Sequence, residues 1–129
     1  GVIPEFTGVL DGQHYKITGL QKPLFDQLKG NVRNLAIEGS TVELSDTPET
    51  VSGILANTME DAVVEQVLLH GIRVNSAAGK AAAVAGTVRN TTMKNLFVEG
   101  AVQAASTAAG VAVTTEGAVF ENIYLNHPD

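Results

Sequence analysis

The chain has 129 residues, a formal net charge of −6, a hydrophobic content of 44% and no cysteine. This hydrophobic content excludes a disordered chain, and the lack of cysteine excludes disulfides and thiolate metal sites. Because the lysines and arginines are few and scattered, we expect neither nucleic acid nor an anionic membrane as a partner. No apolar run reaches membrane-spanning length, so no membrane insertion is expected.

The first predicted strand is HYKITG, residues 14–19, and an Asp11-Gly12 turn precedes it. Asp-Gly is a strong turn signal because both residues tolerate positive φ. Pro23 then marks a corner, since proline lacks the N–H that a strand ladder needs. A second strand segment is expected at 23–30, directly before the stretch that organises the chain.

That stretch is VRNLAIEG, residues 32–39, and it recurs three times. The later copies are VEQVLLHG (64–71), MKNLFVEG (93–100) and FENIYLNH (120–127). A repeat of about 20–30 residues, each carrying one short apolar–any–apolar strand, is typical of a solenoid.

Alignment of the copies predicts two columns of inward side chains. The first column contains Tyr15, Leu35, Val67, Leu96 and Ile123. The second column contains Ile17, Ile37, Leu69, Val98 and Leu125. Gly19, Gly39, Gly71 and Gly100 close successive copies.

Loops are expected between the repeats. The polar segment 40–53 is the longest interruption, and its Ser, Asp, Thr and Pro residues favour an external loop. The three loops that vary between copies are expected at 43–52, 75–80 and 103–108.

The alanine-rich runs 80–86 and 104–113 favour helix by composition alone. Both lack a 3.6-residue apolar stripe and place glycine and threonine between β-branched residues, so we predict strands. A single helical turn at 59–63 stays open as an alternative.

These patterns together predict an all-β protein, a right-handed parallel β-helix of about five coils with loop insertions. We expect residues 1–129 to form a single β-helix domain. Strand-like sequence is already in progress at Gly1, so we interpret the chain as a domain excised from a larger protein.

Charge alternates along a column two residues before the first inward position. Its members are Arg33, Glu65, Lys94 and Glu121. Stacked coils would place these opposite charges side by side, each pair contributing about 0.2–1 kcal/mol.

The next column is rich in side-chain amides. Its members are His14, Asn34, Gln66, Asn95 and Asn122. Because residues 32, 35 and 37 all look buried, strict alternation breaks and a bend must fall at 33–34. Asparagine tolerates such a bend, and its amide can bond to the amide above and below. We therefore predict an amide ladder at a corner.

One outward column, containing Glu38, His70 and Glu99, has the residue types of a metal or acid–base site. We interpret it as a solvated polar face, because a reaction centre needs a cleft and the outer face of a β-coil is flat. His14 and His127 lie at opposite ends of the array and join no such set. No HExxH occurs, and we predict no catalytic, cofactor-binding or metal-binding residue in this chain.

A second outward column grows apolar toward the C-terminal end. It contains Lys16, Ala36, Leu68, Phe97 and Tyr124. A contiguous apolar stripe can mark a docking face, so Leu68, Phe97 and Tyr124 are the candidate docking face. Its occupant is left open between another domain of the parent protein, a foreign partner and this chain's own loops.

The run from Phe6 to Gly39 resembles the β-helical repeat region of the streptococcal immunoglobulin-A-specific zinc metalloproteases. The matching pattern is FxGxLDGxxYxIxGLxxPLFxxLxGxVxNLxIEG, and the copies MKNLFVEG and FENIYLN extend the resemblance over most of the chain. Related glycine-rich repeats of the GLUG type occur in bacterial surface adhesins.

This resemblance implies a domain of a large protease that Streptococcus secretes and holds at its cell wall, outside the cell. In that family the zinc-binding HExxH lies in a separate C-terminal domain, so zinc is expected in the parent's catalytic domain and no cofactor in this fragment. The implied role is a non-catalytic scaffold that positions or gates the catalytic domain, or that helps to hold host immunoglobulin A. The implied partners are the other domains of the parent and immunoglobulin A itself.

Two rival classes are kept. The first is an adhesin-type surface module that binds host protein or glycan. The second is a β-helix enzyme acting on polysaccharide, which would need acids and bases clustered on one face, whereas here the acids alternate with bases.

Overall fold

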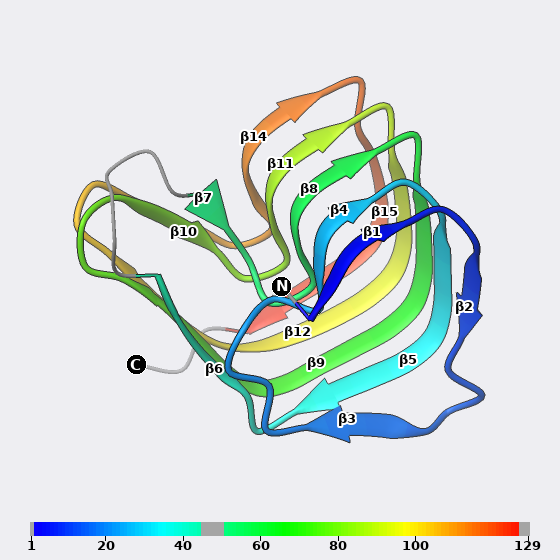
Figure 1. Ribbon diagram of the computed structural model, residues 1–129, viewed down its shortest axis with the longest axis horizontal. Helices are drawn as coiled ribbons and strands as arrows, with labels where there is room; N and C mark the ends of the chain where they lie inside the picture. The colour runs from blue at the N-terminus through cyan, green and yellow to red at the C-terminus, as the bar shows by residue number, and fades with distance from the viewer. Residues whose placement is uncertain (1, 45–50, 127–129) are drawn as a thin grey trace.

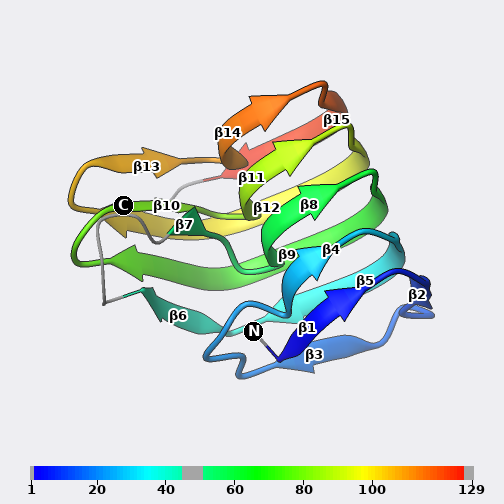
Figure 2. The same ribbon diagram turned by 45° about the horizontal axis from the view of Figure 1, so that its top comes forward.

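A computed structural model describes residues 2–44 and 51–126, and these residues form strands and turns with no helix. The strands run parallel and stack in three sheets around one core (Figures 1 and 2). The predicted all-β parallel β-helix is therefore confirmed. Its right-handed winding stays a prediction.

The first two sheets make up most of the stack. The first sheet has the order β1 (Ile3–Phe6), β4 (Phe25–Leu28), β8 (Ala56–Glu60), β11 (Ala85–Arg89) and β14 (Ala112–Glu116). The second sheet has the order β15 (Val119–Asn126), β12 (Thr92–Ala104), β9 (Val63–Ser76), β5 (Asn31–Glu38) and β2 (Val9–Asp11). β3 (Lys16–Thr18) also pairs with β5, and β6 (Thr41–Leu44) pairs with β9.

The third sheet is shorter. Its strand order is β13 (Thr107–Ala109), β10 (Lys80–Ala82) and β7 (Val51–Ser52). Two sheets thus carry strands at five successive levels, and about three turns are complete with all three sheets. The chain therefore forms about three full turns and not the expected five coils, because in the described part of the chain the third sheet has no strand in the levels of β1 and β4.

The two inward columns form the core of the second sheet. Leu35, Val67 and Leu96 are at most 5% exposed. In the other column, Ile37 pairs with Leu69 and Leu69 with Val98, and all three side chains are fully buried. Each such burial contributes about 1.5–3 kcal/mol relative to an exposed side chain. The alignment of the copies therefore predicted the core register correctly.

The inward prediction for Tyr15 is wrong, because its side chain is 75% exposed. Tyr15 ends a turn in which its N–H donates to the carbonyl of Gly12 at 2.8 Å. It also lies in the first level, where no described coil packs beneath it. Leu125, in the last level, is 40% exposed for the same reason.

The bend that we predicted at 33–34 is present in every level of the second sheet. His14, Asn34, Gln66, Asn95 and Asn122 all have φ between 54° and 65°. This is the left-handed region, which asparagine enters at low cost because its short side chain bonds locally.

The amide ladder at this corner is only partly formed. Asn122 Nδ2 donates to Asn95 Oδ1 at 3.0 Å, which makes one rung. Asn34 Nδ2 turns instead to Asp11 Oδ1 at 3.2 Å.

The glycine column ends before the last copy. Gly19, Gly39 and Gly71 have φ of 70°, 55° and 61° and turn the chain as expected. At Glu99 and Gly100 the register shifts, so that Gly100 pairs with Ile72 and not with Gly71. A Cβ on Gly100 would lie 2.2 Å from the Ile72 carbonyl oxygen, so this glycine serves close approach of two strands.

The segments between repeats agree with the expectations in part. The alanine-rich runs form strands, as predicted, in β10 to β11 and in β13 to β14. The alternative of a helical turn at 59–63 is wrong, because residues 56–60 belong to β8 and a bend follows. Of the expected loops, 43–52 lies partly outside the described residues, and its described ends are not loop, since 43–44 belong to β6 and 51–52 to β7. The expected loops at 75–80 and 103–108 are shorter than predicted, because only 77–79 and 105–106 are bends and each links a long strand, β9 or β12, to a three-residue strand, β10 or β13.

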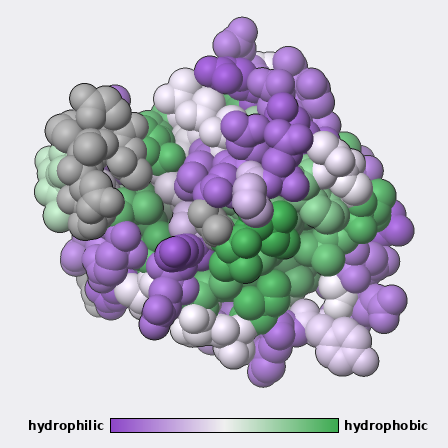
Figure 3. All heavy atoms as spheres, viewed as in Figure 1, coloured by the Kyte–Doolittle hydropathy of each residue, from purple (hydrophilic) through white to green (hydrophobic). Residues whose placement is uncertain are grey.

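The two ends of the stack expose apolar residues. At the C-terminal end, Val119 is 55% and Phe120 42% exposed. At the N-terminal end, Val2 and Val9 are each 57% exposed, while Ile3 and Leu10 only partly cover the core. Figure 1 draws β1 to β3 in front of the later coils, and Figure 3 shows apolar side chains gathered near the middle of that face.

Candidate functional site

The candidate docking face lies on the outer surface of the second sheet. Leu68 on β9 pairs with Phe97 on β12, and Phe97 pairs with Tyr124 on β15. The Phe97 and Tyr124 rings stack with centroids 4.8 Å apart and planes inclined by 8°. Phe97 is 37% and Tyr124 56% exposed, so two aromatic rings meet solvent side by side.

This column continues toward the N-terminal end with one small and one charged side chain. Ala36 on β5 pairs with Leu68, and Lys16 on β3 pairs with Ala36. The column is thus cationic at one end and aromatic at the other. Its stacking follows from the parallel register, which places equivalent residues of successive coils about 4.8 Å apart.

A shallow hollow runs between this face and the amide corner. It is lined by His14, Asn34, Gln66, Val67, Leu68, Asn95 and Phe97. Hydrogen-bonding amides therefore stand beside an apolar and aromatic strip, which is the mixture that orients a bound polar ligand.

The column of Glu38, His70 and Glu99 is assembled as expected. Glu38 pairs with His70 in register, and His70 pairs with Glu99. His70 Nε2 lies 2.9 Å from Glu99 Oε1, but the Glu38 carboxylate turns the other way, to Lys16 Nζ at 3.3 Å. His70 is about half exposed on a flat strand surface. The column thus holds a Lys16–Glu38 ion pair and a separate His70–Glu99 contact on an exposed surface, in line with our interpretation of a solvated face.

Residues 2–44 and 51–126 contain no group of three histidine, cysteine or acidic side chains placed to hold a metal ion. His14 sits in a turn with φ of 65°, and His127 lies outside the described residues.

Within residues 2–44 and 51–126, no helix has the length and apolar character that crossing a membrane requires.

The alternating charge column is confirmed in register. Arg33 pairs with Glu65, Glu65 with Lys94, and Lys94 with Glu121. Lys94 Nζ lies 3.8 Å from Glu121 Oε2, which forms the expected ion pair. Arg33 instead turns to Asp11, with Nε 3.2 Å from Asp11 Oδ2.

Asp11 is the first member of this column, and sequence reasoning missed it. Asp11 pairs with Arg33, and Lys16 pairs with Ala36. The first level therefore has two more residues than the later levels between its charged position and its inward-facing strand. Alignment on HYKITG therefore placed Gln13 at the charged position. The sign alternation itself was the available signal, since it calls for an acid next to Arg33.

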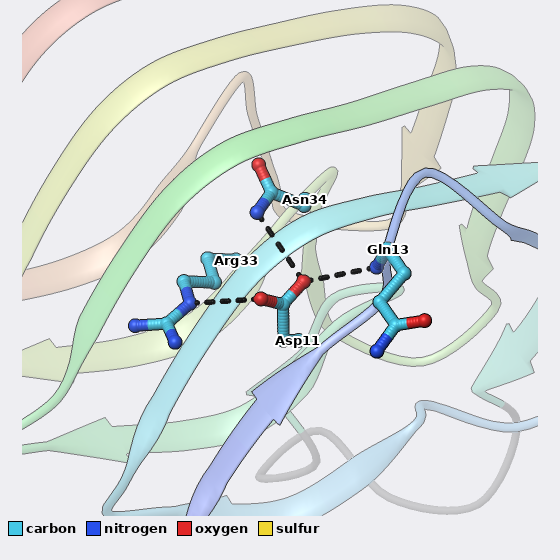
Figure 4. Close-up of polar contacts among 4 residues, drawn as sticks. All are labelled: Asp11, Gln13, Arg33 and Asn34. Atoms are coloured by element: carbon cyan, nitrogen blue, oxygen red, sulfur yellow. Dashed lines mark hydrogen bonds and ion pairs between the residues drawn. The ribbon is translucent and has the colours of Figure 1, made fainter.

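The Asp11 carboxylate is the most elaborately bonded group of the column (Figure 4). It accepts hydrogen bonds from the Gln13 backbone N–H at 2.9 Å, from Asn34 Nδ2 at 3.2 Å and from Arg33 Nε at 3.2 Å. These donors favour the charged form and lower the pKa of Asp11, with the Gln13 N–H as the largest cause. The carboxylate ties the turn after β2 to the second coil.

A second alternating column lies on the first sheet, where sequence analysis did not look. Arg89 pairs in register with Glu60 on one side and Glu116 on the other, and its Nη1 lies 4.0 Å from Glu60 Oε2. Lys29 precedes this series, and its Nζ lies 3.7 Å from Glu5 Oε2. We call the column from Asp11 to Glu121 the first ladder, and the series from Lys29 to Glu116 the second ladder.

Comparison with known proteins identifies the family. No curated protein and no solved structure matches the chain. A family model described as the M26 IgA1-specific metallo-endopeptidase N-terminal region matches residues 2–71. This match covers more than half of the 129 residues. It includes the first two levels, with the organising strand β5 in the second, and most of the repeat region that precedes the Phe97–Tyr124 stack. The chain therefore belongs to the family of the M26 IgA1-specific metallo-endopeptidase N-terminal region.

Proposed function

We propose that this chain is a non-catalytic scaffold and substrate-recognition domain of a secreted, cell-surface zinc metalloprotease that cleaves host immunoglobulin A. The docking face of Leu68, Phe97 and Tyr124 is the observation that carries the proposal. Zinc and the catalytic machinery belong, in this proposal, to another domain of the parent, because the chain contains no HExxH.

The physical support is the exposure of the aromatic pair. Stacked rings on a rigid sheet lose little conformational freedom on binding and offer large apolar contact area, which is why aromatic anchors dominate protein interfaces. Phe97 and Tyr124 lie on the paired strands β12 and β15, which hold the two rings in place, so the face is preorganised. The contact of His70 with Glu99 borders it and supplies a polar rim.

The proposal is tested by titrating ¹⁵N-labelled protein with whole immunoglobulin A1 and following backbone amide resonances. Loss of signal clustered at 68, 97 and 124 supports recognition of the substrate. The double variant Phe97→Ser/Tyr124→Ser should abolish this loss, whereas Val9→Ser, which removes an equally exposed apolar residue on β2, should leave it unchanged.

The scaffold role has its own readout. If immunoglobulin A1 causes no change, the same titration with the catalytic domain of the parent should perturb the docking face, and that result assigns the face to contact between domains. Absence of change with both partners at high concentration overturns the proposal.

The alternative is an adhesin-type module that binds host glycan. The hollow beside Asn34, Gln66 and Asn95 favours it, since amide side chains next to an aromatic ring suit a sugar. Titration with released host glycans discriminates the two. Shifts confined to these amides and Phe97, without an effect of deglycosylated immunoglobulin A1, would support the adhesin function and contradict substrate recognition.

A further inference from the structure

Arg73 is an exposed outward residue of β9, in the middle level of the stack, and no acid faces it in its column. Its partners in register are Thr41 on β6 and Ala101 on β12. The chain's other arginines, Arg33 and Arg89, each form an ion pair in a charge ladder, whereas Arg73 forms none with the described residues. Its guanidinium is therefore a cation that an anionic ligand can reach from solvent.

A hollow lies beside Arg73 where β9 and β12 pass a corner of the coil. It is lined by Thr41 and by residues 71–73 and 99–101. The register shift at Gly100 leaves Gly71 as one extra residue of β9 against β12, which is a β-bulge. Gly71 has no side chain to fill the space, since a Cβ there would meet only the Gly39 nitrogen, at 3.8 Å. The volume of about 220 Å³ is below the range of about 300–1,000 Å³ for drug-sized ligands, so the hollow suits one small ring.

The polar groups around the hollow favour a sugar acid. The planar guanidinium of an arginine binds a carboxylate through two parallel hydrogen bonds. The Glu99 carboxylate, whose Oε1 lies 2.9 Å from His70 Nε2, accepts hydrogen bonds from hydroxyls, and the Thr41 hydroxyl both donates and accepts. Glu99 and Glu43, which is exposed on β6 two residues beyond Thr41, repel a ligand with several negative charges. A ring with one carboxylate and several hydroxyls satisfies all these groups, whereas a phosphate or an acidic peptide does not.

We propose that Arg73, Thr41 and Glu99 form a binding site for a sugar acid. Arg73 holds the carboxylate of the ligand, and Thr41 and Glu99 hold its ring hydroxyls. Along β9 the outward residues follow in the order Leu68, His70 and Arg73, so the contact of His70 with Glu99 separates this site from the docking face. The site therefore does not depend on the docking face or on its occupant.

The test titrates the ¹⁵N-labelled chain with two sugar acids, glucuronic acid and N-acetylneuraminic acid. Binding should shift the backbone amides of 41, 71–73 and 99–101, and the acid that binds more tightly identifies the ring. Two further probes divide the ligand, because its methyl ester keeps the ring without the charge and acetate keeps the carboxylate without the ring. Each should bind about 10-fold or more weakly than the acid, since hydrogen bonds to charged groups have that worth.

Substitution of the arginine provides the matched variants. Arg73→Gln should weaken binding of the sugar acid about 10-fold or more and leave the weak binding of the methyl ester unchanged. Arg73→Lys keeps the charge but loses the planar donor pair, so its affinity should be intermediate. Arg89→Gln makes the same change in net charge on the first sheet and should leave binding as it is. A well-dispersed amide spectrum of each variant shows that it is folded.

Four results would overturn the proposal. They are equal binding of the sugar acid and its methyl ester, equal binding of the sugar acid and acetate, binding of the acid that survives Arg73→Gln, and no shift at 41, 71–73 or 99–101 with either acid at high millimolar concentration.

Discussion

Phe97 and Tyr124 lie on neighbouring strands and stack with ring centroids 4.8 Å apart, although each ring remains more than a third exposed. The pair is held by the parallel register of β12 and β15. Because the pair lies on the outer surface, it is available for binding and contributes little to the core.

Removing the aromatic pair should therefore cost little stability. Tyr124→Ala is expected to lower the free energy of unfolding by about 0.5–1.5 kcal/mol, the worth of an aromatic contact. Leu69→Ala, at a fully buried position, should cost about 2–5 kcal/mol. Urea unfolding of the two variants measures the difference, and equal costs would show that the face is part of the core.

Gly86 is expected to tolerate no side chain. A Cβ there would lie 2.5 Å from the Val51 carbonyl oxygen, which belongs to the backbone and has little freedom to move. Gly86→Ala should destabilise by about 1–3 kcal/mol or more. Gly8→Ala is the matched control, because its Cβ would meet only the Phe6 ring at 3.6 Å. A thermal midpoint unchanged in Gly86→Ala would contradict the close packing of β11 against β7.

Asn95 should be replaceable by glycine but not by alanine. Its φ of 55° costs a residue with a Cβ about 1–2 kcal/mol, whereas glycine adopts it freely. Asn95→Ala should therefore unfold at lower denaturant concentration than Asn95→Gly, even though both lose the hydrogen bond from Asn122. The reverse order would contradict the idea that the left-handed backbone conformation at residue 95 limits which residues are tolerated there.

Asp11 makes stability depend on pH in acid. Its pKa is lowered in the folded state below the ordinary value of 3.8, so its contribution is fully present above that value. The contribution is lost as the pH falls through the lower folded-state pKa. Compared with Asp11→Asn, the native chain should have the higher denaturation midpoint at pH 7, and the gap should close below pH 3.8. A gap independent of pH would mean that the turn depends on the shape of the side chain and not on its charge.

When residues 1–129 are studied as an isolated chain, the first and last levels of the stack should exchange backbone hydrogens faster than the middle levels. Strands at a free edge lack a neighbour on one side and open locally at low cost. Exchange is expected to be fast at 6–20 and 118–126, and slow at 35–37, 67–69 and 96–98. Uniform protection along the chain would indicate that a second molecule covers both ends.

Sequence repeats were sufficient for the architecture and for the core register. VRNLAIEG and its later copies predicted which residues point inward, and the buried side chains of Ile37, Leu69 and Val98 follow that register. The copies also predicted the corner at Asn34, because burial on both sides of a short segment requires the chain to bend there. The apolar outward column of Leu68, Phe97 and Tyr124 was predicted for the same reason, since strand alternation fixes which residues face solvent.

Other features could be known only from the tertiary structure, because they depend on contacts between levels. The two-residue extension of the first level moved Asp11 into the first ladder, and the register shift at Gly100 broke the glycine column. The exposure of Tyr15 and Leu125 followed from their place at the ends of the stack. A repeat pattern fixes the periodicity within a coil because side-chain alternation is local. It does not determine which residue meets which across levels wherever a copy gains or loses a residue, because that depends on how the neighbouring coil is built.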